Sequence, residues 1–266
     1  MKSFWIILFL AILQGLTEPI PVSSSGHLVL AQALFGIESN DATLEILLHG
    51  GSLIAVVLFY FTDIKGLVVD NIQFVFQKKK EKKAAFDYAL KLVIATIPAG
   101  IIGLLFKDNI EATLSNPRVV GYTLLFTAFM LASTYLVSAK PKKEITPLKA
   151  LIIGIAQAVA LLPGVSRSGM TTSTAMLTQT DPADAMRFSF LMFIPIATLV
   201  LLLGIPEILA QPNFGDYALS YLVAVIASGV VTFYAMRLVK LVLKSRKYHW
   251  FSLYCATLGV LVLFMY

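Results

Sequence analysis

Charged residues are scarce in this sequence. Only 14% of its 266 residues are charged, 58% are hydrophobic, and the mean hydropathy is +0.83. A soluble domain of this length needs more polar surface than that. Cysteine is almost absent too: Cys255, inside an apolar run, is the only one, which excludes disulfide bonds and thiolate metal sites and predicts a packed thiol. The composition therefore indicates an integral membrane protein.

Long apolar runs set the expected architecture. Six of them are close to the ~20 residues that a helix needs to cross ~30 Å of hydrocarbon. They cover residues 42–62, 88–106, 119–138, 188–209, 217–236 and 250–266. We expect an all-α integral membrane protein with six full transmembrane helices, forming a single membrane domain over residues 1–266.

One segment of the sequence occurs twice. Residues 14–26 (QGLTEPIPVSSSG) align without a gap with residues 157–169 (QAVALLPGVSRSG), and the register continues to Leu48 and Leu191. Such self-similarity at a fixed offset is typical of a duplicated unit. We expect repeat one to cover residues 1–139 and repeat two to cover residues 146–266.

Proline, serine and glycine interrupt both copies in the middle. This pattern predicts two re-entrant helical hairpins, at residues 4–36 and 147–178. A bilayer tolerates irregular backbone only where protein or a wet cavity satisfies its polar groups, so the two tips should meet in a cavity. Three full spans separate the hairpins, and because three is odd, the second repeat should be inverted relative to the first.

Basic residues lie mostly on one side of this topology. Sixteen fall there and only Lys2, Lys107 and Arg118 fall on the other side. The positive-inside rule then puts both termini outside the cell. The asymmetry accounts for the net charge of +6, so we expect no nucleic-acid partner. A cleaved signal peptide at residues 1–13 is disfavoured, because no small-x-small cleavage site follows.

The two copies differ at the polar positions of their tips. Repeat one carries Glu18, Ser24 and His27 where repeat two carries Leu161, Arg167 and Met170. The division predicts one composite site. A guanidinium at a glycine-flanked helix start predicts an anion site, and we expect the anion to be phosphate. The residues expected to bind the phosphate are Arg167, Ser25, Ser166, Ser168, Gly26 and Gly169.

Serine, histidine and glutamate suggest the chemistry of this site. A serine needs an adjacent base to become a nucleophile, and His27 lies three residues beyond Ser24. Glu18 and Gln14 are one helical turn apart, so the carboxylate could orient His27, act as the base, or hold a divalent ion.

Two further assignments stay open at this point. Ser23 and Ser166, present in both copies, could cap the half-helices or take part in catalysis. Glu45 and His49, spaced i, i+4 on the next span, could line the cavity or form a buried pair that fixes helix packing.

The segment PVSSSGH preceded by QGLTE, together with PGVSRSG, resembles the undecaprenyl-diphosphate phosphatases of the bacitracin-resistance type, over essentially the whole chain. The resemblance implies a bacterial inner-membrane hydrolase that converts undecaprenyl diphosphate to undecaprenyl phosphate and inorganic phosphate, recycling the lipid carrier of cell-wall precursors. Its pocket would open to the periplasmic or extracellular side. It would use a divalent cation, Mg or Ca, bound together with the substrate diphosphate.

Carried over to this sequence, the family's motifs fall on residues already singled out. Its acidic motif falls on Gln14 and Glu18, its phosphate arginine on Arg167 with Ser166, and its serine and histidine motif on Ser24, Ser25 and His27. The first acidic position is glutamate in some members and glutamine here, so Glu18 would be the only anion of the motif.

Two other functions compete with this one. A secondary transporter or lipid-carrier flippase would share inverted repeats with broken helices. An acid-phosphatase-like lipid phosphatase would need a second histidine after the arginine, and the only later one, His249, lies at the cytoplasmic border. The expected partners are undecaprenyl diphosphate and membrane lipids, and a homodimer is compatible with the sequence.

Overall fold

The fold is built from helices alone in the part of the chain that the structure describes. This computed structural model describes residues 4–36, 42–106, 116–137, 143–211 and 214–266, and these ranges contain no β-strand. The expectation of an all-α protein is confirmed. Lys2, Lys107, Lys140 and Lys142, and the last residue of the span expected at 119–138, lie outside these ranges. The elements are α1 (Phe4–Thr17), α2 (Ser24–Leu34), α3 (Ala42–Phe59), α4 (Phe61–Gln77), η1 (Lys80–Lys82), α5 (Lys83–Leu105), α7 (Pro117–Ser133), η2 (Thr134–Leu136), α8 (Pro147–Val159), α9 (Arg167–Leu177), α10 (Pro182–Ala210), α11 (Phe214–Lys244), η3 (Tyr248–Trp250) and α12 (Phe251–Met265).

Five helical segments are long and apolar enough to cross a membrane. They are Lys80–Leu105, Pro117–Leu136, Pro182–Ala210, Phe214–Lys244 and Tyr248–Met265, and α3 with α4 would count as a sixth, broken span. Many of their large apolar side chains are exposed, for example Leu209 and Phe264, which are 80% and 86% exposed. Contiguous apolar surface of this kind is typical of a lipid-facing protein. The chain is a multi-pass membrane protein.

The first expected span differs from a single straight helix. The chain bends by 73° between α3 and α4, at Tyr60. The segment after the bend carries a polar residue on nearly every turn, and it does not continue in the direction of α3. Instead α4 folds back along α5, where Lys82 pairs with Asp70 at 2.8 Å and Asn71 donates to the Ala85 carbonyl.

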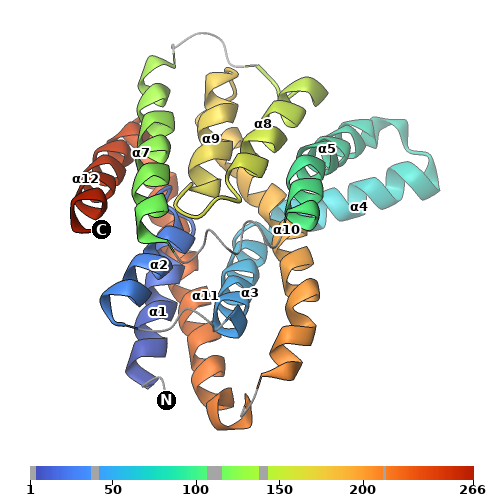
Figure 1. The fold of residues 1–266 in the computed structure, drawn as a ribbon. Coiled ribbons are helices and arrows are strands. Elements are labelled where there is room, and N and C mark those ends of the chain that lie inside the picture. Colours follow the sequence, from blue (N-terminus) through green and yellow to red (C-terminus); the bar gives the residue numbers. More distant parts are fainter. Residues whose placement is uncertain (1–3, 37–41, 107–115, 138–142, 212–213) are drawn as a thin grey trace.

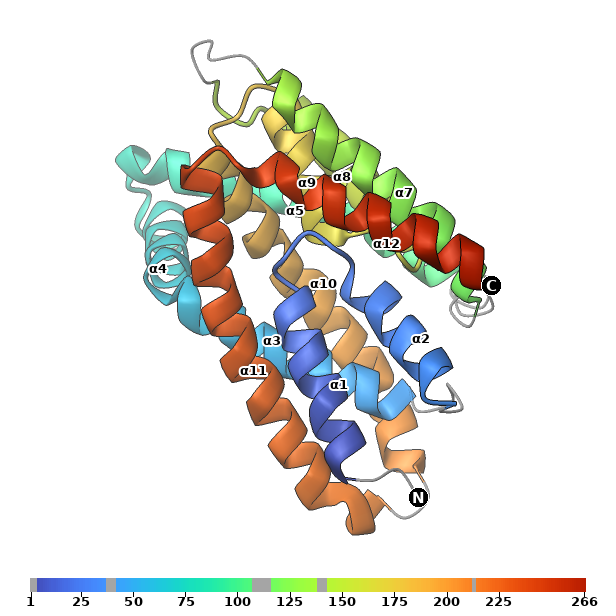
Figure 2. The same ribbon diagram turned by 90° about the vertical axis from the view of Figure 1, so that its left-hand side faces the viewer.

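The two segments expected as hairpins each form two helices joined by an irregular break. Residues 18–23 separate α1 from α2, and residues 160–166 separate α8 from α9. In Figure 1 the first pair occupies the lower half of the view and the second pair the upper half, so their breaks meet in the middle of the molecule. Figure 2 shows the same meeting point from the side.

The first turn of α2 touches the second break directly, and glycine is required there. A Cβ on Gly26 would lie 2.9 Å from the Gly164 Cα, which is too close for any side chain. Gly164 itself has a φ of +84°, and a Cβ there would meet the Thr123 hydroxyl. The expectation that both tips lie close together is confirmed.

Helices of one half pack mainly on helices of the other half. α1 and α3 both lie against α11, α8 lies against α5, and α7 lies against α12. α9 is enclosed at the centre, with nine of its eleven residues buried. Cys255 is also fully buried among apolar neighbours, which confirms the packed thiol. This interlocked packing brings the two breaks together from segments more than a hundred residues apart.

Candidate active site

Glu18 is the centre of the polar cluster at the meeting point of the two breaks. Its carboxylate accepts hydrogen bonds from Gln14 Nε2 at 2.9 Å, from Ser24 Oγ at 2.5 Å and from Arg167 Nη2 at 2.6 Å. Glu18 follows α1 directly, where Pro19 ends the helix. The first copy thus supplies the carboxylate and hydroxyl, and the second supplies the cation.

Arg167 is held in place on two sides. It is the first residue of α9, and its guanidinium carbon lies 3.9 Å from the centroid of the Phe193 ring of α10. Its other terminal nitrogen, Nη1, is buried and has no hydrogen-bond partner among the described residues. A buried donor without a partner is costly, so this nitrogen is available for an anionic ligand.

The pattern of serines shared by the two copies corresponds to a repeated local structure. Ser23 Oγ accepts a hydrogen bond from the Gly26 amide, and Ser166 Oγ accepts one from the Gly169 amide. Ser23 and Ser166 therefore cap α2 and α9, as one of the two open readings predicted. In each copy the capping hydroxyl also lies 3.4 Å from the hydroxyl two residues later, that of Ser25 and that of Ser168.

His27 has two partners, and Ser24 is not one of them. Its Nδ1 lies 2.7 Å from the Ser23 carbonyl oxygen and its Nε2 lies 2.7 Å from the Tyr254 hydroxyl of α12. A carbonyl only accepts, so Nδ1 carries a proton, and in the neutral ring Nε2 then accepts from Tyr254. The two rings are also stacked, with centroids 5.7 Å apart.

Sequence spacing predicted a contact between His27 and Ser24, whereas the structure places Glu18 against Ser24. The reason lies in the first turn of α2. Ser24 is the first residue of this helix, and its side chain faces back to the end of α1. His27 lies one turn further along, so its imidazole reaches the carbonyl oxygen of Ser23, the N-cap of the same helix. Tyr254 was not singled out from the sequence. Its signal was weak, one of three hydroxyl side chains in an apolar helix.

His49 of α3 also reaches the cluster. Its Nε2 lies 3.7 Å from Glu18 Oε2, and its Nδ1 bonds the Glu45 carbonyl oxygen at 2.9 Å. His49 therefore lies beside the central carboxylate. The backbone carbonyl of Glu45 holds the His49 imidazole in this position.

The donor set limits how a metal ion could bind. The described residues contain no group of three or more histidine, cysteine, aspartate or glutamate side chains that could hold one. Near Glu18 there is an orphaned oxygen, Gln14 Oε1, which is buried without a hydrogen-bond partner in the described part of the chain. One carboxylate and one amide oxygen fit a hard cation that takes most of its ligands from substrate phosphates.

Comparison with known proteins points to one family. The family described as "Bacitracin resistance protein BacA" matches residues 7–261. "Undecaprenyl-diphosphatase 2" of Bacillus thuringiensis is 42% identical over 99% of each chain. "Undecaprenyl-diphosphatase 1" of Bacillus licheniformis is 43% identical over 96% of each, and "Undecaprenyl-diphosphatase" of Oceanobacillus iheyensis is 40% identical over 98% of each. With its composite cluster and a match over nearly its whole length, this chain belongs to the bacitracin resistance protein BacA family.

Proposed function

We propose that this protein hydrolyses undecaprenyl diphosphate to undecaprenyl phosphate and inorganic phosphate, recycling the lipid carrier of cell-wall precursors. The names of its relatives support this substrate. The observation that carries the proposal is the contact between Glu18, Ser24 and Arg167 inside a membrane-embedded chain, because it joins a nucleophile, a base and a phosphate ligand.

The diphosphate would bind at the facing starts of α2 and α9. Free amides at a helix N-terminus and the helix dipole favour phosphate. Arg167 would add its free Nη1 to these donors, and Ser25 and Ser168 would add hydroxyls. The prenyl tail would stay among the apolar helices or in the surrounding lipid.

In the chemical step, Ser24 Oγ would attack the terminal phosphorus while Glu18 takes the hydroxyl proton. The bond from that phosphorus to the bridging oxygen would break, and undecaprenyl phosphate would leave. Water would then attack the phosphoserine and release inorganic phosphate, returning Ser24 to its hydroxyl form. The 2.5 Å contact between Ser24 and Glu18 supports this division of labour.

His27 would serve as a second proton-transfer group, and its partner would be Tyr254, not Ser24. The imidazole of His27 and the hydroxyl of Tyr254 are hydrogen-bonded, and His27 lies one helical turn from Ser24 on α2. Arg167 would stabilise charge that builds up on the transferred phosphoryl group.

A divalent cation, Mg or Ca, would fit beside Glu18 and Gln14. It would neutralise part of the negative charge of the bound diphosphate. The orphaned Gln14 Oε1 and the scarcity of other carboxylates among the described residues there support a cation held mainly by the substrate.

For the topology we propose two inverted repeats, each beginning with a re-entrant pair, with the site open to the outer face of the bacterial cell membrane and both termini outside. The packing supports this arrangement, because the re-entrant pair of each half lies against helices of the other half. The helix α1 of the first half lies on α11 of the second, and α8 of the second half lies on α5 of the first. In Figure 2 the start of α1 and the end of α12 lie toward the same side, away from the turn between α11 and α12.

The decisive experiment is phosphate release from a C55 prenyl diphosphate by detergent-purified protein, with Mg²⁺ or Ca²⁺ and with a chelator. We expect release with the ion and loss of release with the chelator. Protein that releases no phosphate under either ion would contradict the enzyme and favour a transporter or flippase. A homodimer stays a prediction, to be checked by the mass of the protein in detergent.

A further inference from the structure

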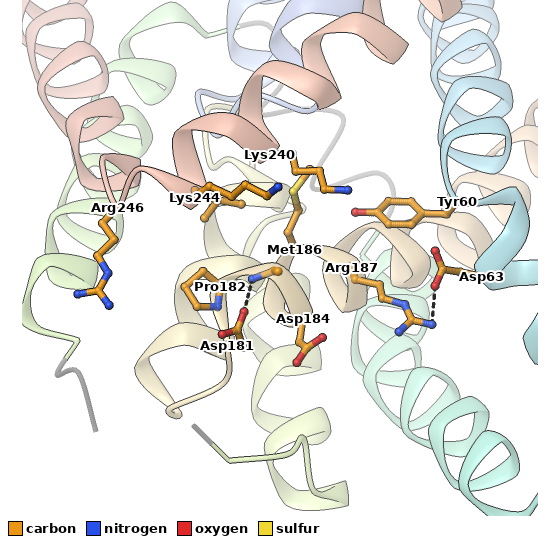
Figure 3. Close-up of a pocket in the computed structure, with 12 residues that line it drawn as sticks. Tyr60, Asp63, Asp181, Pro182, Asp184, Met186, Arg187, Lys240, Lys244 and Arg246 are labelled. Atoms are coloured by element: carbon orange, nitrogen blue, oxygen red, sulfur yellow. Dashed lines mark hydrogen bonds and ion pairs between the residues drawn. The ribbon is translucent and has the colours of Figure 1, made fainter. Parts of the chain in front are cut away.

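A separate cavity of about 420 Å³ lies away from the Glu18 cluster, where α10 begins and α11 ends. Figure 3 shows its lining, which includes Tyr60, Arg187, Lys240, Lys244 and Arg246. None of the residues assigned to the active site lines it. The mechanism proposed above makes no use of it.

Three parts of the fold form this cavity. The first turns of α10 form one wall and the last turn of α11 forms another. The bend between α3 and α4 closes the third side, because it directs Tyr60 and Asp63 to the cavity. The bend at the end of α3 thus provides one wall of this cavity.

The charges around the cavity do not balance. Asp63 is already paired with Arg187 at 2.6 Å, and Asp181 caps α10 by accepting from the Ala183 amide. Among the described residues, no carboxylate forms an ion pair with Lys240, Lys244 or Arg246, and the only other acidic residue in the lining is Asp184. The lining holds four basic side chains, Arg187, Lys240, Lys244 and Arg246, against three carboxylates, Asp63, Asp181 and Asp184, so the cavity carries a net charge of +1.

The cavity also has an apolar side. Met186, Leu243 and Pro182 contribute to the lining, and Lys240 extends over the Phe59 ring. Figure 3 shows the amines of Lys240 and Lys244 on the same side of the cavity, with Lys240 directed toward Tyr60. Amine and phenol donors beside an apolar wall suit an anionic group that is attached to a hydrophobic body.

We propose that this cavity binds a phosphate group, either as the headgroup of an anionic phospholipid or as free inorganic phosphate. Basic cavities between membrane helices are typical sites for anionic headgroups. The volume falls in the range of small-molecule sites, and the first turn of α10 presents the positive end of its dipole. The proposal does not depend on the catalytic activity.

The test measures binding of two probes to the purified full-length chain by calorimetry: dioctanoyl phosphatidic acid and inorganic phosphate. The variant Lys240→Gln/Lys244→Gln should weaken binding by about ten-fold or more, since each basic residue near an anionic surface contributes roughly a five-fold factor. A matched control, Lys79→Gln/Lys80→Gln, removes two exposed lysines outside the cavity and should leave binding unchanged.

Two further variants separate binding in this cavity from effects of charge and from binding at the active site. Ala183→Trp should fill the cavity and weaken binding with no change of charge, since Ala183 is exposed and lines the cavity. Repeating the measurement in an Arg167→Ala background removes phosphate binding at the active site, and the binding that remains should still depend on Lys240 and Lys244. Phosphate that competes with the lipid would identify free phosphate as the ligand, and lipid binding without competition would identify the headgroup. Equal binding by wild type and both cavity variants would overturn the proposal.

Discussion

The two breaks share a scaffold and differ in how their backbone is supported. Both have a serine cap and the same contact between two serine hydroxyls. The second break is braced by α7: Thr123 donates to the Pro163 carbonyl, and Thr127 bonds both the Gly164 carbonyl and the Ser166 amide. Within the described ranges the first break has no such brace from threonines, and its polar side chains face Glu18 and one another instead.

This difference indicates a division of labour. In the proposed mechanism, the braced second break would hold Arg167 in place, whereas the first break would present the groups that change protonation and form bonds. The two copies have similar helix starts and differ at three positions, so one would serve the chemistry and the other the positioning of the phosphate. Arg167 would then be a fixed reference for the phosphate, which is what electrostatic preorganisation requires.

The largest effect should come from the reactive break. Ser24→Ala removes the proposed nucleophile and should lower kcat by at least about 10,000-fold, while substrate binding persists. Phosphate release and binding of a prenyl diphosphate should be measured on the same preparation. Near-normal turnover would exclude Ser24 as the nucleophile and leave direct attack by His27, or by a water activated by Glu18, as the mechanism.

The second largest loss of activity should come from replacing Arg167, at the braced second break. Arg167→Ala should lower kcat/KM by about 100- to 1,000-fold, with both binding and turnover affected, because it removes charge stabilisation in substrate and transition state alike. Arg167→Lys should recover little, since a single ammonium cannot reproduce the planar fork. A lysine variant with wild-type kinetics would show that only the charge is needed.

Breaking the brace should destabilise the protein without removing any catalytic group. Thr127→Val is close in shape, but it leaves the buried Gly164 carbonyl and Ser166 amide without their hydroxyl partner, at a cost of about 1–3 kcal/mol. The unfolding midpoint in detergent should fall. As a matched control, Thr96→Val on α5 removes a hydroxyl that only bonds within its own helix and should have a smaller effect.

The interaction between His27 and Tyr254 makes a smaller prediction. Tyr254→Phe keeps the stacked ring and removes one hydrogen bond, so kcat should fall about ten-fold. If Tyr254 acted only through the packing of its ring, loss of its hydroxyl would leave the hydrogen bonding of the His27 imidazole unchanged. Nitrogen NMR of His27 should therefore show a change at Nε2 in the variant and little change at Nδ1, which keeps the Ser23 carbonyl.

These predictions combine what the sequence indicated with what only the structure shows. The repeat, the breaks and the meeting of Glu18 with Arg167 could be read from the sequence, because a gapless duplication whose copies differ at polar positions predicts one composite site. The partner of His27 could not, since Tyr254 lies 227 residues away and no spacing rule connects them. The partner of Ser24 depends on which way each side chain points at a helix start.

The bend after α3 was missed for a different reason. Apolar residues continue to Thr62, so composition alone extends the span, although the polar turns of α4 already begin at Asp63. Hydropathy averaged over a span does not detect a change of direction within it. The bend matters because it supplies one wall of the second cavity.

The smallest effect concerns the two caps themselves. Ser23 has a φ of +71°, whereas Ser166 has a φ of −73°. A side chain at positive φ costs about 1 kcal/mol, and glycine at an N-cap costs only a few tenths relative to serine. Ser23→Gly should therefore leave the unfolding midpoint unchanged or raise it slightly, while Ser166→Gly should lower it.

Comparing these two glycine variants tests why the first copy keeps a serine in a strained conformation. Strain that persists in a protein is commonly found at functional sites, and Ser23 precedes Ser24 and accepts the His27 Nδ1 proton at its carbonyl. If the strain positions these neighbours, Ser23→Gly should reduce phosphate release at full stability. Equal losses of stability in both variants would mean that the two caps are equivalent after all, and that the first break is no more strained than the second.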